Sequence, residues 1–227
     1  MSRSQLLAAA ILAAASATSA SASTVLWTDW TSATTTTVHG AIIGAPSVTV
    51  NFSTSGEALN FVHLSSGTNY WTEGTPAPYT GGSVSNAPPS PDIISLNAGG
   101  TKTITFSQTV TNPYIAFVSW NGNTAVFDHP FVKISDGCGY WGCGTFAAFG
   151  NAFIGSGEVH GILQFPGTFT TLSFADTNEN WHGLTIGIDG VAAVPEPPTW
   201  ALMMLGIGGL GAMLRTNRRR QGALTVA

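Results

Sequence analysis

Short apolar runs, many of them alternating with polar residues, fill the chain between residues 23 and 193 and restrict the fold it can form. The runs are rich in Val, Ile, Thr and Phe and are separated by clusters of Gly, Pro, Asn and Asp, which is the pattern of strands joined by turns. No convincing amphipathic helical period is present in this range. The pattern therefore predicts an all-β domain, an antiparallel β-sandwich or jelly roll, with a solenoid as the weaker alternative because no fixed-period repeat is found. The best strands are predicted at residues 24–30, 36–43, 47–53, 101–106, 114–120, 131–135, 158–165, 169–175 and 183–189.

The N-terminal residues have the composition of a secretory signal peptide. Arg3 supplies a positive charge, residues 6–15 are apolar, and Ala20-Ser21-Ala22 offers a small-residue cleavage site. Cleavage after Ala17 or Ala20 fits the same composition. We predict that residues 1–22 are the signal peptide, that residues 23–193 form one exported domain, and that residues 194–227 are a separate C-terminal segment.

The predicted exported domain is acidic. It contains two lysines, Lys102 and Lys133, no arginine and ten acidic residues, a side-chain balance of −8. Nucleic-acid binding needs a basic surface, and this composition provides none.

The C-terminal segment changes composition abruptly. Pro195-Glu196-Pro197 is kept extended by its prolines, residues 200–214 carry no charge, and Arg215, Arg218, Arg219 and Arg220 follow. Fifteen residues of helix rise about 22 Å, less than the hydrocarbon core of about 30 Å. We predict a single short transmembrane helix, with its arginines in the cytoplasm and the domain before it outside.

In this order, the Pro-Glu-Pro triplet, the short apolar segment and the Arg-rich end resemble the PEP-CTERM sorting signal of Gram-negative bacteria. The resemblance implies that an exosortase, an integral-membrane cysteine-type enzyme similar to transpeptidases, removes the tail near Pro195-Glu196-Pro197. It also implies sorting of the domain to the cell surface or extracellular polymer. The same signature is sometimes labelled the C-terminal domain of ice-binding proteins, a label that describes only the tail. The extension at residues 221–227 departs from the usual pattern, and an ordinary membrane anchor is the alternative interpretation.

Cys138 and Cys143 are the only cysteines of the chain. In an exported protein they are expected to form a disulfide bond, which would hold Tyr140 and Trp141 outward in a Gly-rich loop. A redox or metal site is the weaker alternative, because two cysteines without a neighbouring histidine offer too few ligands.

Two groups of aromatic residues are candidates for glycan binding, because aromatic rings pack on the apolar faces of sugars. Tyr70 and Trp71 lie with Tyr79 in a long polar segment at residues 65–91, where loops of a sandwich often carry function. Tyr140 and Trp141 lie between the cysteines. The alternative for residues 70, 71 and 79 is that they pack against one end of the sandwich.

Metal ligation is less well supported by the sequence. We predict no cofactor, but a structural calcium ion is an open alternative. Carboxylates that could bind it lie near predicted turns: Asp128, Asp136, Asp176, Glu179 and Asp189. His39, His160 and His182 each precede a glycine but lack the spacing of a metal motif, so we expect structural roles for them.

No catalytic motif is recognisable. We therefore expect a non-enzymatic binding or scaffolding protein, with an exosortase and an exopolysaccharide as partners. The alternative is a carbohydrate-active hydrolase, which would require acids such as Glu73, Asp128 or Glu158 to converge in a cleft. Ice binding through Thr101-Lys102-Thr103-Ile104-Thr105 is a third class, disfavoured because the array is short.

Overall fold

The computed structural model describes residues 22–43 and 47–190. The chain divides into one unit that ends at Gly190 and a second that begins at Val191, and the description below concerns the first. The predicted signal peptide, apart from Ala22, and the predicted transmembrane helix lie outside the described residues.

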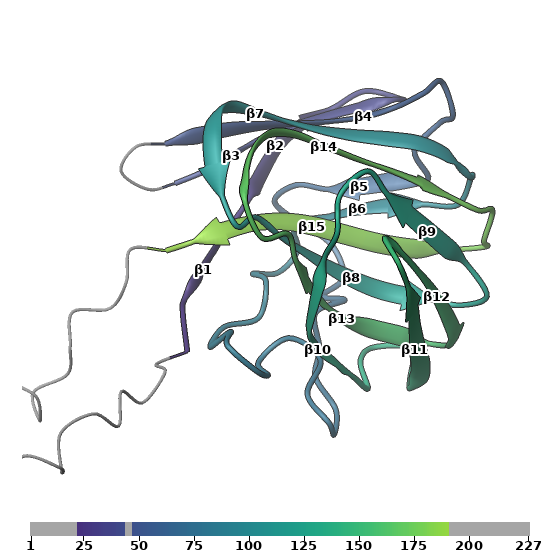
Figure 1. Ribbon diagram of the computed structural model, residues 1–227. Coiled ribbons are helices and arrows are strands. Elements are labelled where there is room, and N and C mark those ends of the chain that lie inside the picture. Colours follow the sequence, from purple (N-terminus) through teal and green to yellow (C-terminus); the bar gives the residue numbers. More distant parts are fainter. Residues whose placement is uncertain (1–21, 44–46, 191–227) are drawn as a thin grey trace, which may run out of the picture. The chain divides into compact units, whose positions relative to one another are not determined.

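The described residues form fifteen β-strands and no helix (Figure 1). The strands are β1 (Val25–Trp27), β2 (Asp29–Ala33), β3 (Thr37–Ile42), β4 (Val48–Thr54), β5 (Phe61–His63), β6 (Ile93–Leu96), β7 (Gly100–Thr111), β8 (Tyr114–Trp120), β9 (Thr124–Phe127), β10 (Val132–Gly137), β11 (Gly144–Phe149), β12 (Ala152–Gly157), β13 (Val159–Gln164), β14 (Thr168–Asp176) and β15 (His182–Asp189).

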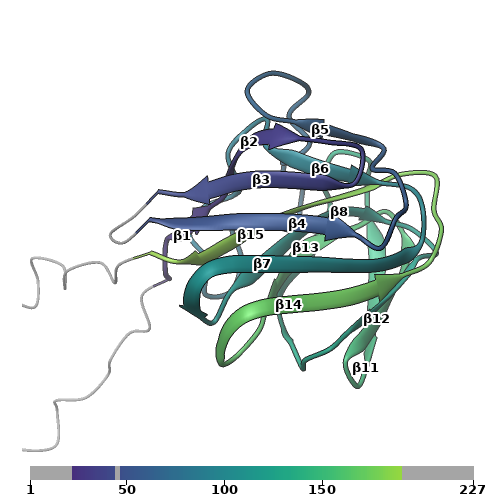
Figure 2. The same ribbon diagram turned by 90° about the horizontal axis from the view of Figure 1, so that it is seen from above.

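The strands belong to two antiparallel sheets. The seven-stranded sheet has the order β10-β13-β8-β15-β6-β5, and β1 joins it by pairing with β15. The eight-stranded sheet has the order β11-β12-β9-β14-β7-β4-β3-β2, and Figure 2 shows β2, β3, β4, β7 and β14 side by side. The predicted all-β, two-sheet antiparallel architecture is therefore confirmed.

The main hydrophobic core lies between the two sheets. Phe52 and Ile104 of the eight-stranded sheet belong to the same buried cluster as Phe117 and Ile186 of the seven-stranded sheet. Such burial follows from the alternation in the sequence: β7 buries Lys102, Ile104 and Phe106 while Thr101 and Thr105 stay exposed.

The predicted strand at residues 24–30 is in fact two strands in different sheets. Thr28 marks the crossing, because its backbone N–H and its Oγ1 hydroxyl both donate to the carbonyl oxygen of Ile186, at 2.9 and 2.8 Å. Before Thr28, β1 pairs with β15, and after it, β2 pairs with β3 in the other sheet. The expectation of one continuous strand is therefore wrong.

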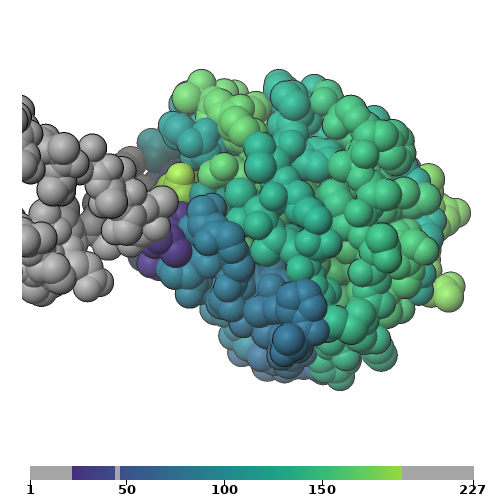
Figure 3. Space-filling view, turned by 60° about the horizontal axis from the view of Figure 1, so that its bottom comes forward, coloured from purple at the N-terminus to yellow at the C-terminus, as the bar shows by residue number. Residues whose placement is uncertain are grey.

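The segment between β5 and β6 covers the outer face of the seven-stranded sheet. A second buried cluster joins Trp71, Tyr79 and Val84 of this segment to Tyr114 and Val118 of β8. Figure 3, in which the bottom of Figure 1 comes forward, shows this segment in blue on that face. Both faces of the sheet are thus covered, which explains why all seven residues of β8 are buried.

Candidate functional site

Four aromatic residues from three parts of the chain meet at one end of the seven-stranded sheet. Tyr70 lies in the covering segment, Tyr140 and Trp141 follow β10, and Trp181 directly precedes β15. The ring centroid of Tyr70 lies 5.0 Å from that of Tyr140 and 4.8 Å from that of Trp181, and the Trp141 and Trp181 centroids are 6.1 Å apart. Tyr140 and Trp141 are 42% and 52% exposed. We call these four residues the aromatic cluster.

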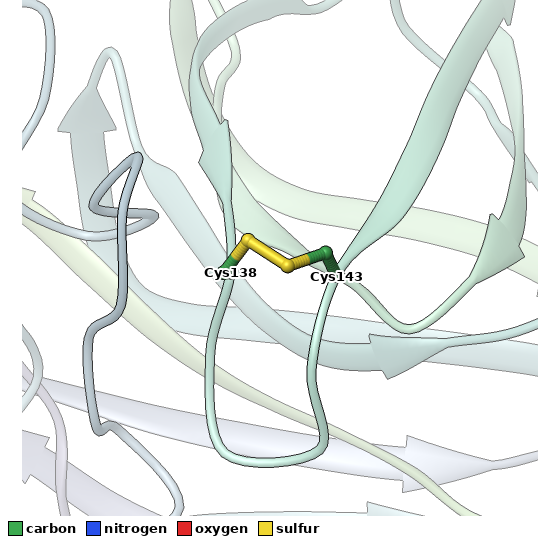
Figure 4. The surroundings of a disulfide bond; sticks show 2 residues. All are labelled: Cys138 and Cys143. Atoms are coloured by element: carbon green, nitrogen blue, oxygen red, sulfur yellow. A yellow bond between two sulfur atoms is a disulfide. The ribbon is translucent and has the colours of Figure 1, made fainter.

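A disulfide bond closes the loop that carries Tyr140 and Trp141 (Figure 4). The sulfur atoms of Cys138 and Cys143 lie at bonding distance, 2.00 Å, as the sequence predicted. Inside this ring the backbones of Gly139 and Gly142 exchange two hydrogen bonds, at 2.8 and 3.1 Å. Gly142 has a φ of 121°, a conformation that favours glycine. The two aromatic residues therefore lie at the tip of a short, cross-linked turn.

The base of this loop is attached to the rest of the domain. The Cys138 N–H donates to the carbonyl oxygen of Pro76, at 2.9 Å, and the Gly74 N–H donates to that of Cys138, at 2.7 Å. Gly139 lies against the buried ring of His160, where a Cβ atom would come within 2.7 Å of the imidazole. These contacts fix the direction in which Tyr140 and Trp141 project.

A pocket of about 300 Å³ lies beside the aromatic cluster. In the seven-stranded sheet, β8 lies between β13 and β15 and runs antiparallel to both (Figure 1). The pocket lies where the end of β8 meets the beginnings of β13 and β15. Its lining combines two indole rings with carboxylates, amides and a hydroxyl: Ser119, Asn121, Trp141, Glu158, Glu179, Asn180 and Trp181.

Asn121 connects the two carboxylates of the pocket. Its Nδ2 donates to Glu158 Oε1 at 3.0 Å, and its backbone N–H donates to Glu179 Oε1 at 2.8 Å. The Ser119 hydroxyl donates to the other oxygen of Glu158. Ser119 has a φ of 56°, which is uncommon for a residue with a side chain, and such backbone conformations gather at functional sites.

A buried ionic network lies behind Glu179. Lys102 Nζ is 2.7 Å from Asp176 Oδ1, His182 Nε2 is 3.0 Å from Asp176 Oδ2, and His182 Nδ1 is 3.3 Å from Glu179 Oε2. Burial by itself lowers the pKa of His182, but the hydrogen bonds and charges of Asp176 and Glu179 outweigh burial and raise it. We call Lys102, Asp176, His182 and Glu179 the buried network. The buried network contacts Glu179 through His182, on the side of this carboxylate away from the pocket.

The predicted glycan-binding residues differ in their exposure to solvent. Tyr70, Tyr140 and Trp141 belong to the aromatic cluster, but Trp71 is 3% exposed and its Nε1 donates to the carbonyl oxygen of Asp92, at 3.0 Å. Trp71 therefore has no ring face to offer a ligand, and we correct the expectation for this residue. Tyr79 is also buried, with its hydroxyl 3.3 Å from the carbonyl oxygen of Phe117. For these two residues the packing alternative holds.

Of the three acids named for a hydrolase, only Glu158 lines the pocket. Glu73 Oε1 accepts the backbone N–H groups of Tyr79 and Thr80, at 2.8 and 2.7 Å, and stabilises a turn of the covering segment. Asp128 accepts from the backbone and hydroxyl of Ser173, at 3.0 and 2.8 Å. The second carboxylate of the pocket is Glu179, which the sequence suggested only as a calcium ligand.

The acids considered for calcium have separate partners. Asp136 pairs with Lys133, Asp189 accepts the Tyr114 hydroxyl at 2.7 Å, and Asp128 is bound as described above, whereas Asp176 and Glu179 share His182. Within residues 22–43 and 47–190, no three His, Cys, Asp or Glu side chains are arranged to hold a metal ion.

The three His-Gly pairs lie in different surroundings. His39 is exposed on β3 and contacts Asn51. His160 is buried beneath the cross-linked loop, and burial lowers its pKa to about 4, so it is neutral near neutral pH. His182 belongs to the buried network.

Comparison with family models finds that residues 193–220 match the PEP-CTERM protein-sorting motif. The searches of curated proteins and of solved structures found no match. Among the described residues, no helix is long and apolar enough to span a membrane, and the segment predicted to do so lies outside them. The sorting motif implies recognition by an exosortase and an exported, membrane-anchored precursor that is sorted to the cell surface. The chain is therefore a PEP-CTERM sorting domain-containing protein.

Proposed function

We propose that the exported sandwich is a non-enzymatic binding module that attaches to exopolysaccharide through the aromatic cluster and the adjoining pocket. The observation that carries this proposal is the lining of the pocket, in which Trp141 and Trp181 stand beside two amides, a hydroxyl and two carboxylates. Ring faces pack on the apolar faces of sugars, while amides and carboxylates bind sugar hydroxyls. A volume of about 300 Å³ is at the lower end for ligand pockets and suits one sugar unit of a longer polymer.

Sorting determines where in the cell envelope this binding takes place. The predicted signal peptide directs export across the inner membrane of a Gram-negative cell, and the C-terminal segment holds the precursor there until exosortase cuts near Pro195-Glu196-Pro197. The released domain then stays at the cell surface or in the extracellular matrix, where it binds or scaffolds the polymer.

The proposal is tested by removing one ring. Trp141→Ala should weaken retention of the full-length chain, purified in mild detergent, on immobilised exopolysaccharide from the host cell. Truncating a central tryptophan of an interface typically costs about 2 kcal/mol or more, which is about thirtyfold in affinity. Phe149→Ala is the matched control, because Phe149 is 56% exposed but does not line the pocket.

Equal retention of Trp141→Ala and wild type would show that the aromatic cluster is not the binding surface. Equal loss in both variants would show that the assay measures general exposed hydrophobicity. Unchanged thermal unfolding of Trp141→Ala excludes a folding defect.

A second candidate, a glycoside hydrolase, is favoured by the presence of Glu158 and Glu179 in one pocket. Such enzymes place two carboxyl groups on either side of the scissile bond. Binding remains the better proposal because both oxygens of Glu158 already accept hydrogen bonds and the Glu179 side chain is only 8% exposed. Release of reducing ends by the wild type, abolished in Glu158→Gln, would establish the hydrolase instead.

A further inference from the structure

Glu158 is a carboxylate without a cationic partner. Among the described residues, no Lys, Arg or His nitrogen forms an ion pair with it. The two lysines of the domain are engaged elsewhere: Lys102 is bound to Asp176, and Lys133 is bound to Asp136 and lies 5.2 Å from the centroid of the Phe146 ring. The partners of Glu158, Asn121 and Ser119, are neutral. Its negative charge therefore remains uncompensated at the wall of the pocket.

Glu179 is the second carboxylate of the pocket. Its side chain is 8% exposed, its Oε1 accepts the backbone N–H of Asn121, and its Oε2 lies 3.3 Å from His182 Nδ1 in the buried network. Because His182 is already bound to Asp176, its charge is shared between two carboxylates.

The aromatic walls favour the same kind of ligand. The faces of tryptophan and tyrosine rings carry negative electrostatic potential and attract a cation within about 6 Å of the ring centroid. Trp141 and Trp181 line the same pocket as the two carboxylates. Rings and carboxylates together therefore select for a positively charged group, whereas an anionic sugar would be repelled.

We infer that the pocket binds an amino sugar with a free ammonium group, so that the partner polymer is a cationic, incompletely N-acylated polysaccharide. The inference rests on the proposed function and specifies its ligand. The ammonium lies between Glu158 and the indole rings, and the sugar ring stacks on Trp141. Asn121 and Asn180 bind its hydroxyls. A sugar is favoured over a small quaternary ammonium compound because the amides of the pocket match hydroxyl groups, which such a compound lacks.

The test compares two probes that differ only at the sugar nitrogen, which is a charged ammonium group in one and a neutral acetamide in the other. The full-length chain in mild detergent is titrated calorimetrically with an oligomer of glucosamine and with the same oligomer fully N-acetylated, at a mildly acidic pH. We expect the glucosamine oligomer to bind at least tenfold more tightly, the difference typical of one hydrogen bond to a charged group. Because the interaction is ionic, the difference should shrink as salt is added.

Two isosteric variants assign the effect to the pocket. Glu158→Gln should reduce the preference for the glucosamine oligomer over the N-acetylated oligomer about tenfold, because only the first carries the ammonium group that the carboxylate attracts. Glu57→Gln removes the same charge elsewhere, at a carboxylate that accepts from Ser55 at 2.9 and 3.0 Å, and should leave this preference unchanged. Trp141→Ala should weaken binding of both oligomers.

The outcomes separate this inference from the proposed function. Equal affinity for the two oligomers, both lost in Trp141→Ala, overturns the amino-sugar inference and leaves a general glycan module. No binding of either oligomer or of host exopolysaccharide overturns both. Tighter binding of choline or of oligolysine than of the glucosamine oligomer overturns the sugar assignment. An equal effect of Glu57→Gln reduces the site to unspecific attraction by an acidic domain.

Discussion

The two lysines of the described domain form ion pairs of nearly equal length in very different surroundings. Lys102 Nζ lies 2.7 Å from Asp176 Oδ1, and both side chains are 0% exposed. Lys133 Nζ lies 2.8 Å from Asp136 Oδ1, and those side chains are 39% and 34% exposed. Removing one partner of a buried pair leaves an uncompensated charge in the core, whereas removing one of an exposed pair leaves a charge in water.

Lys102→Met should therefore lower the free energy of unfolding by about 3–5 kcal/mol. Methionine fills much of the same space, but Asp176 keeps only His182 as a charged partner, and the carbonyl oxygens of Ala98 and Gly100 lose a donor. Lys133→Met should cost at most about 1 kcal/mol.

Urea unfolding of wild type and both variants, followed by tryptophan fluorescence, measures the difference. Equal losses in the two variants, or a loss below about 1 kcal/mol in Lys102→Met, would refute the reasoning that burial decides the cost. Adding Asp176→Asn to Lys102→Met should recover part of the loss, because the uncompensated carboxylate is then gone.

Three further predictions concern other parts of the chain. Burial raises the pKa of Asp92 from 3.8 to about 6, so the folded wild type loses stability as this carboxyl ionises with rising pH. In urea unfolding, the free energy of unfolding of Asp92→Asn relative to wild type should increase by about 1 kcal/mol from pH 4 to pH 7, after allowance for solvent screening. An equal difference at both pH values would contradict this. Cys138 and Cys143 of protein recovered from outside the cell should resist alkylation without reductant, and full alkylation would disprove the bond. Glu196→Gln should leave an uncut, membrane-retained precursor, and deletion of residues 200–227 should release an unsorted domain; an intact end with Arg218, Arg219 and Arg220 on the surface protein, found by mass spectrometry, would leave only the plain-anchor interpretation.

Alternation made most of the sheet structure predictable. Each of the nine predicted segments contains a strand, since residues such as Ile104 and Leu172 occupy buried positions between more exposed threonine or serine residues. Five strands were missed, and their compositions explain why. β11 and β12 contain glycines and alanines, which have low strand propensity, and β5, β6 and β9 are three or four residues long.

The candidate site was only partly predictable. Tyr140 and Trp141 were identified because the two cysteines enclose them, which is a local signal. Glu158 and Glu179 lie far apart in sequence and meet only because β8 pairs with both β13 and β15. Trp181 had a usable signal, since it precedes a histidine that already drew attention. The burial of Trp71 could not be foreseen, because it depends on how the covering segment folds back onto β8.

Strand register also changes how the threonine array should be understood. The sequence shows a short run on one strand, but Thr103 lies between Ser53 and Ser173, and Thr105 lies between Asn51 and Thr171 on the neighbouring strands. The outer face of the eight-stranded sheet therefore carries hydroxyl and amide rows across β4, β7 and β14. Only 8% of the residues in the chain are charged, so these rows supply hydrogen bonds to water that charges supply in most domains. They contain no aromatic ring and no carboxylate, which is why we place sugar binding at the end of the seven-stranded sheet and not on this face.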